Sequence, residues 1–96
     1  MLKIVAKMIV KAEELEKFKG LAKELVQKSR AEKGNVFYSL NKSIGNDREL
    51  MFLECWQDQS AIDTHNATEH FRGILPKLAE LCESASPVEI FREIEL

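Results

Sequence analysis

Hydrophobic and polar residues alternate over residues 2–11, which is the pattern of a β-strand whose side chains point to the two faces of a sheet. The same alternation predicts a strand over residues 35–43. A second strand, largely apolar on both faces, is predicted over residues 49–57, and turn-forming residues at 44–48 separate the two. We expect this pair to form an antiparallel hairpin. A last strand is predicted over residues 88–96. Its expected inward side chains are Val88, Ile90, Ile94 and Leu96.

Two other regions place apolar residues at helical spacing. The first predicted helix runs from residue 13 to about residue 33, and Gly34 fits the left-handed position that follows many helices. A capping box over residues 60–63 predicts a short helix to about residue 67, and Thr68 is suited to cap a further helix over residues 69–82. Pro76 predicts a kink or break within that last helix.

The strand at residues 49–57 is apolar on both faces. One face carries Leu50, Phe52, Glu54 and Trp56, and the other carries Met51, Leu53 and Cys55. The element order βαββαβ predicts one α+β domain over residues 1–96, a ferredoxin-like sandwich whose helices cover a single face of the sheet. The other face would then expose a contiguous apolar patch, which marks an association surface. We therefore expect a homodimer in which a second copy covers this face.

Composition and charge exclude several classes of protein. The 96 residues carry a formal net charge of −2, and basic and acidic residues are interspersed, so we expect no nucleic-acid partner. No apolar run approaches the roughly 20 residues of a membrane span, so we expect no membrane partner. The two cysteines have neither disulfide-framework nor zinc-site spacing, and we expect a cytoplasmic protein.

Three segments resemble motifs of one known family. They are residues 32–38 (EKGNVFY), 52–56 (FLECW) and 65–71 (HNATEHF). In this order and spacing they resemble the antibiotic biosynthesis monooxygenase family, which is known for dimeric α+β barrels. The haem-degrading branch places asparagine, tryptophan and an axial histidine near the positions of Lys7, His65 and Leu75, and this chain has none of them. The resemblance therefore implies oxygenation without haem, metal or flavin.

His65 is the candidate catalytic residue, because the resemblance places it at a pocket between sheet and helices. An imidazole that titrates near neutrality is suited to take a proton from a quinol or an enol. The alternative is a structural histidine that is hydrogen-bonded at a helix end. His70 follows five residues later, about 140° around an ideal helix, so the two histidines would not share a face of a continuous helix. A metal pair is therefore poorly supported, and His70 is assigned to the pocket rim.

The remaining candidates form a predicted substrate-binding set, and each has a structural alternative. Trp56 is suited to stack on a planar ligand, although a strand tryptophan is more often core. Glu54 is either an acid of the site or, as we favour, half of an ion pair with Arg72 or Arg92. Tyr38 either donates a hydrogen bond to a substrate oxygen or packs. The predicted set is Tyr38, Glu54, Trp56, His70 and Phe71.

These observations predict a cofactor-independent monooxygenase that acts with dioxygen on a small quinol or polyphenol. One alternative is an isomerase or degrading enzyme for a small carbonyl-rich signal compound, in which His65 would again move a proton. A pocket lined by several basic groups, which Lys3, Lys7 or Arg72 would supply, would favour phosphorylated substrates. The other is a non-catalytic dimer that binds small molecules, which a wholly apolar pocket with His65 pointing outward would favour.

Overall fold

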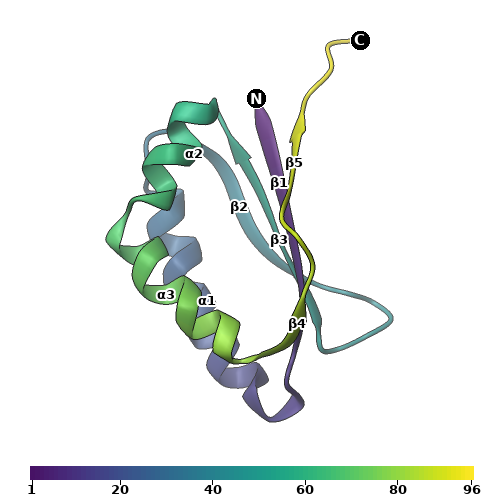
Figure 1. Ribbon diagram of the computed structural model, residues 1–96. Helices are drawn as coiled ribbons and strands as arrows, with labels where there is room; N and C mark the ends of the chain where they lie inside the picture. Colours follow the sequence, from purple (N-terminus) through teal and green to yellow (C-terminus); the bar gives the residue numbers. More distant parts are fainter.

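The computed structural model describes all 96 residues as an antiparallel sheet with helices on one face (Figure 1). Its elements are β1 (Leu2–Val10), the 3-10 turn η1 (Ala12–Glu14), α1 (Leu15–Arg30), β2 (Asn35–Lys42), β3 (Glu49–Trp56), α2 (Gln59–Asn66), α3 (Glu69–Glu80), β4 (Cys82–Ala85) and β5 (Glu89–Arg92). The strand order is β2-β3-β1-β4, and β5 pairs with the first half of β1. The predicted α+β ferredoxin-like fold is confirmed, with α2 and α3 separate as predicted and with one strand, β4, that the sequence did not predict.

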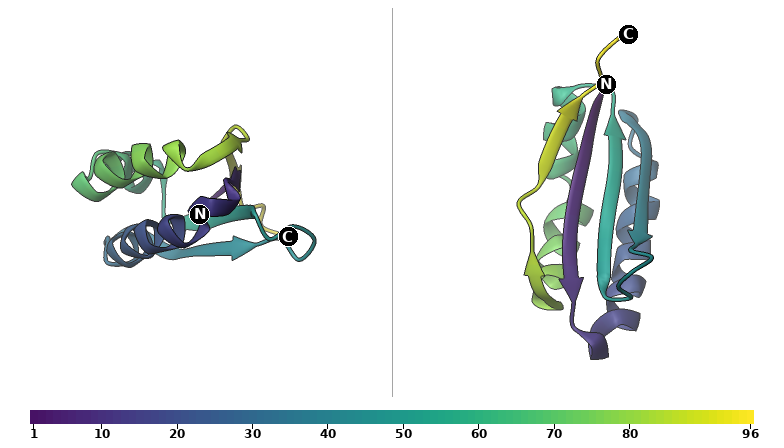
Figure 2. Two further views of the ribbon diagram at one scale, coloured as in Figure 1. Left: turned by 90° about the horizontal axis from the view of Figure 1, so that it is seen from below. Right: turned by 90° about the vertical axis from the view of Figure 1, so that its right-hand side faces the viewer.

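One face of the sheet packs against the helices, and Figure 2 shows the helices behind the sheet when it is seen from its open side. Alternation along β3 turns Leu50, Phe52, Glu54 and Trp56 toward the helices, where all four are buried. Phe18 and Leu25 of α1 pack into the same core. The sequence left open which residues of this strand face the helices, and the structure assigns them.

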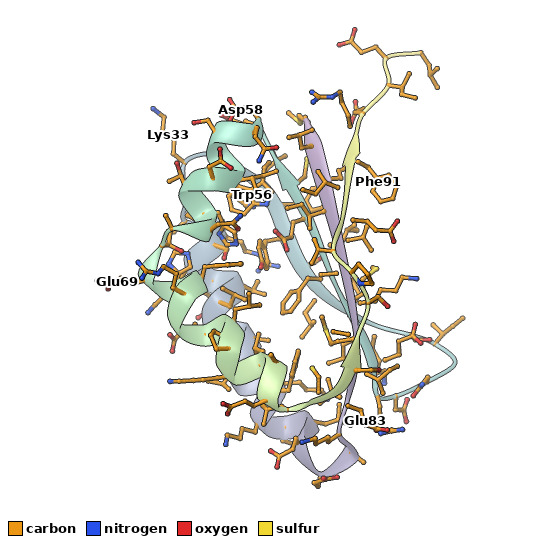
Figure 3. The ribbon with its side chains drawn as sticks, in the orientation of Figure 1. Lys33, Trp56, Asp58, Glu69, Glu83 and Phe91 are labelled. Carbon is orange, nitrogen blue, oxygen red and sulfur yellow. The ribbon has the colours of Figure 1, made fainter.

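The open face of the sheet is largely apolar. Val5 of β1 pairs with Leu53 of β3, and both are half-buried although no helix covers them. Met51 is also half-buried, while Phe37 and Phe91 are 38% and 50% exposed. Phe91 projects from β5 on the side away from the helices (Figure 3). We call Val5, Phe37, Met51, Leu53 and Phe91 the outer-face patch.

The helix boundaries correct two predictions and confirm a third. Asp58, and not Ser60, caps α2, because its carboxylate accepts a hydrogen bond of 2.9 Å from the Ala61 amide. Thr68 caps α3 as predicted, accepting from the Phe71 amide at 3.2 Å. The helix continues through Pro76, since the carbonyl that loses its donor belongs to the exposed Arg72. The helical region is divided only between α2 and α3, where the sequence also predicts a boundary.

The predicted last strand over residues 88–96 is too long. Strand β5 ends at Arg92, which pairs with Leu2, so the partner strand β1 offers little beyond that point. Val88 and Ile90 line a cavity as inward residues, but Ile94 and Leu96 are 77% and 117% exposed. The inward assignment of these last two residues is wrong for the single chain.

Gly34 is required by close packing and not by a left-handed backbone, because no glycine has a positive φ. A Cβ built on Gly34 would lie 2.4 Å from the Cβ of Ala61 in α2. We therefore expect Gly34→Ala to lower the free energy of unfolding by about 1–3 kcal/mol, as overpacking does. Gly20 in α1 has open space around its Cβ position, so Gly20→Ala should raise stability by about 0.5–1 kcal/mol. Urea unfolding measures both, and a Gly34→Ala protein as stable as the wild type would contradict the packing.

Candidate functional site

A cavity of about 350 Å³ lies between the sheet and the helices. This volume falls within the range of small-molecule sites in proteins. Sixteen of its 21 lining residues are hydrophobic. The polar lining includes Tyr38 of β2, Glu54 of β3 and His65 of α2, so three separate elements bring titratable groups to a mainly apolar space.

His65 is held tightly at the end of α2. Its side chain is 1% exposed, and its ring lies 4.4 Å from the Trp56 ring and 4.9 Å from the Phe71 ring, measured between centroids. Its Nδ1 lies 2.6 Å from Oε2 of Glu32. An ionised carboxylate only accepts hydrogen bonds, so we assign the ring proton to Nδ1. Nε2 is then left with a free lone pair, and it is buried without a hydrogen-bond partner.

The charge state of His65 follows from its surroundings. Burial lowers its pKa, and the nearby Glu32 carboxylate opposes this effect without reversing it. The imidazole is therefore neutral near pH 7, with Nε2 as its one free basic atom. A neutral imidazole that a carboxylate holds in a fixed tautomer is the arrangement of a general base.

His70 contacts the same carboxylate. Its Nε2 lies 2.8 Å from Oε2 of Glu32, so both histidines converge on one oxygen atom. On a single continuous helix, His65 and His70 would lie on different faces, as the sequence predicts. The chain instead leaves α2 at Ala67 and starts α3 after Thr68, which turns the second histidine back toward the first.

Glu32 was missed as a site residue by the sequence analysis. It lies just after the end of α1, at the first position of the motif 32–38, and both histidines belong to the motif 65–71. The co-occurrence of an acidic residue and two histidines in two family motifs was the available signal. Their hydrogen bonds now join these two motifs in space.

Glu54 forms no ion pair, so the expected pairing with Arg72 or Arg92 is wrong. Both arginines are exposed, whereas Glu54 is 6% exposed and is one of the residues that line the cavity. The Trp56 Nε1–H donates to Oε1 of Glu54 at 2.9 Å. Burial raises the pKa of Glu54 to about 6, although the bond from Trp56 opposes the rise. Burial and the neighbouring Glu54 also raise the pKa of Tyr38, which stays a neutral hydroxyl.

The raised pKa of Glu54 predicts a pH-dependent stability. The folded state binds this proton more tightly than the unfolded state, so the contribution is fully present below about pH 4.5 and is lost as pH rises through about 6. A rise of this size corresponds to about 2 kcal/mol. We expect Glu54→Gln to gain about that much stability relative to the wild type between pH 4 and pH 7. Unfolding curves at both pH values measure this, and a difference that does not change with pH would contradict it.

Comparisons with known proteins identify the family of this chain. The family model for antibiotic biosynthesis monooxygenase matches residues 1–77. The Bacillus subtilis protein named "Putative monooxygenase YcnE" is 39% identical over 92 residues, which are 96% of this chain and 95% of that protein. The chain belongs to the antibiotic biosynthesis monooxygenase family. Membership in this family supports a general monooxygenase-like role.

Solved structures of this family share the fold. A crystal structure described as an antibiotic biosynthesis monooxygenase superposes with a TM-score of 0.93 at 30% identity, covering 99% of this chain and 100% of its own. A conserved protein from Methanosarcina mazei Go1 gives a TM-score of 0.94 at 31% identity, covering 97% of this chain and 92% of its own. None of the helices in the present structure is both long and apolar enough to cross a membrane.

The predicted site residues fall into two groups. Tyr38, Glu54, His65 and Phe71 line the cavity. Trp56 and His70 do not line the cavity. Each contacts a residue of the site from behind the lining. Trp56 is fully buried, donates to Glu54 and packs on His65, while His70 bonds to Glu32. Contacts join Glu54, Trp56 and His65, and Glu32, which the sequence did not identify, joins His65 to His70.

Proposed function

We propose that the protein is a cofactor-independent monooxygenase that acts with dioxygen on a small quinol or polyphenol in the cavity. The observation that carries the proposal is the free Nε2 of His65, which is buried while Glu32 fixes the opposite nitrogen. A base of this kind needs an acidic O–H as its partner. A planar hydroxylated aromatic also matches a cavity with mainly apolar walls and a few polar groups.

The reaction starts with proton transfer. The substrate O–H bond breaks, the proton moves to Nε2 of His65, and its electron pair stays on the substrate oxygen as a quinolate. The electron-rich anion passes one electron to dioxygen, and recombination of the two radicals forms a C–O bond to a peroxide, which takes the proton back from His65. The O–O bond and the ring C–H bond then break, one oxygen atom stays on the ring, the other leaves as water, and the quinol is oxidised to a hydroxyquinone. The apolar walls exclude water and protect the intermediates.

Two further polar groups orient the substrate. The Tyr38 hydroxyl stays protonated and donates a hydrogen bond to a substrate oxygen, while Glu54 accepts one from a second hydroxyl. Both lie on the sheet, opposite the helix that carries His65. A substrate with two hydroxyl groups therefore uses the polar atoms on both walls.

The cavity's polar groups favour this function over the two alternatives. Of the three basic residues considered for a phosphorylated or carbonyl-rich substrate, Lys7 lines the cavity and Lys3 and Arg72 do not. A purely binding module was expected to show an apolar pocket with His65 outside it. His65 instead lines the cavity, together with Glu54 and Tyr38.

The proposal includes a homodimer joined through the outer-face patch. Each large apolar side chain left in water forgoes roughly 1.5–3 kcal/mol of burial free energy. The patch places five apolar side chains on one open sheet face, of which Phe37 and Phe91 are exposed and the other three half-buried. Val88 and Ile90, which line the cavity, are exposed as well. A second copy packed on this face covers the patch by a closed, self-complementary contact.

Oxygen uptake tests the proposed function. The chelator-treated protein is mixed with a panel of hydroquinones, catechols and their methyl ethers, and an oxygen electrode records consumption. We expect uptake with the free hydroxyl compounds and none with the fully methylated ethers, because the ethers offer no proton to His65. Product analysis should show one oxygen atom from dioxygen in the ring. Absence of uptake with every quinol would contradict the proposal.

A further inference from the structure

The cluster formed by Glu32, His65 and His70 has features of a metal site. Its members come from three separate segments: the connection after α1, the end of α2 and the start of α3. Each offers one ligand atom, and these atoms all lie within 4.8 Å of one another. We propose that this cluster is a binding site for a divalent transition-metal ion of the zinc class, held by two imidazole nitrogens and one carboxylate oxygen.

The donor set selects the kind of ion. Imidazole nitrogen suits zinc, copper, nickel and iron, whereas magnesium and calcium prefer sites made of oxygen atoms alone. Two imidazoles and one carboxylate leave a position open for water around a tetrahedral zinc ion. Glu32 and His70 are 13% and 14% exposed, so the cluster lies close enough to the surface for an ion to enter.

The charge balance of the cluster favours a cation. Glu32 is largely buried, and its side chain contacts the two histidines but pairs with no lysine or arginine. Its second oxygen, Oε1, is buried and has no hydrogen-bond partner. Burial of an incompletely paired carboxylate is costly, and a divalent ion would supply both the missing charge and the missing ligand.

A nitrogen that binds a metal ion carries no proton, so the ion would replace the hydrogen bonds that now join His65 and His70 to Glu32. On His65 the proton moves from Nδ1 to Nε2, which removes the free lone pair of that ring. The ion is therefore inhibitory, a consequence that rests on the proposed function.

The position of the cluster agrees with an inhibitory ion. Glu32 and His70 are not among the residues that line the cavity, whereas His65 is. The proposed ion would therefore lie on the Nδ1 side of His65, beside the cavity lining and not within it. It would affect the reaction through the tautomer of His65 and not by contact with dioxygen or the substrate.

Metal binding without substrate tests the site itself. Tag-free protein is titrated with Co²⁺ by visible absorption and with Zn²⁺ by calorimetry. We expect one saturable site of micromolar or tighter affinity in the wild type. In His70→Gln and Glu32→Gln the affinity should fall by at least roughly 10–100-fold, which is the loss that changes in the residues around metal ligands cause. Cys82→Ser is the control, because Cys82 is a partly exposed thiol outside the cluster, and its affinity should equal that of the wild type. Equal affinity in His70→Gln, or no saturable binding, would overturn the proposal.

A melting experiment keeps the test decisive if a variant folds poorly. Zinc at a concentration well above its dissociation constant should raise the wild-type Tm, since it binds the folded state. An unchanged wild-type Tm would overturn the site. Zinc should also suppress oxygen uptake reversibly, and chelator should restore it. Binding without suppression would contradict the inhibitory role while leaving the site standing, and absence of uptake in the metal-free protein would contradict the proposed function alone.

Discussion

His65→Ala is expected to lower quinol-dependent oxygen uptake at least ~100-fold, because it removes the free Nε2 that takes the substrate proton. The loss should appear mainly in kcat, since the apolar walls that bind the ring remain in place. His65 is fully buried between Trp56 and Phe71, so folding of the variant must be checked by circular dichroism. His65→Gln fills more of the space and should show the same loss.

His70→Ala is the comparison variant for this experiment. His70 bonds to the same Glu32 oxygen but does not line the cavity, so its removal should reduce uptake much less than removal of His65. Equal losses in the two variants would indicate that the cluster has only a structural role. Uptake that survives His65→Ala unchanged would remove His65 from the mechanism.

Leu53→Glu is expected to convert a dimer into a monomer. Leu53 lies near the middle of the outer-face patch, where it pairs with Val5 of β1 and with Ser39 of β2. A carboxylate at this position would be buried without a partner in the dimer but solvated in the monomer, which costs the dimer several kcal/mol. Several kcal/mol corresponds to a rise of more than ~100-fold in the dissociation constant.

Analytical ultracentrifugation at micromolar concentration measures this shift. Gln27→Glu, on the exposed surface of α1, adds the same charge away from the sheet and should sediment like the wild type. A wild-type protein that sediments as a monomer would contradict the dimer. So would a Leu53→Glu protein that sediments like the wild type.

The fold could be predicted largely because its signals are local. Alternation on β1 and β3 and the apolar face of α1 gave each element within a few residues. Errors occurred where partners far apart in the sequence decide the outcome. A side chain at Gly34 would collide with Ala61 of α2, and the last strand ends at Arg92, opposite the first residue of its partner strand β1.

The candidate site was less predictable, since it depends on how two helices meet. Thr68 was correctly predicted as a cap. The chain changes direction at this residue, and the sequence did not show that this change brings His70 close to His65. Glu54 was expected to need a cation, but an indole N–H and a raised pKa make its burial possible. Glu32 has no periodic pattern around it, and only the three-dimensional structure joins it to both histidines.

The central claim is that His65 takes a proton from a bound quinol, and the pH profile of kcat/KM for oxygen uptake tests it most directly. Burial lowers the pKa of His65, so its Nε2 is free to accept a proton near pH 7 and is lost as a base only when the pH falls through that lowered pKa. The wild type is predicted to keep its full kcat/KM near pH 7 and to lose it below pH 6.5, and the residual uptake of His65→Gln is predicted to lack this acid limb. The same acid limb in His65→Gln would contradict the account.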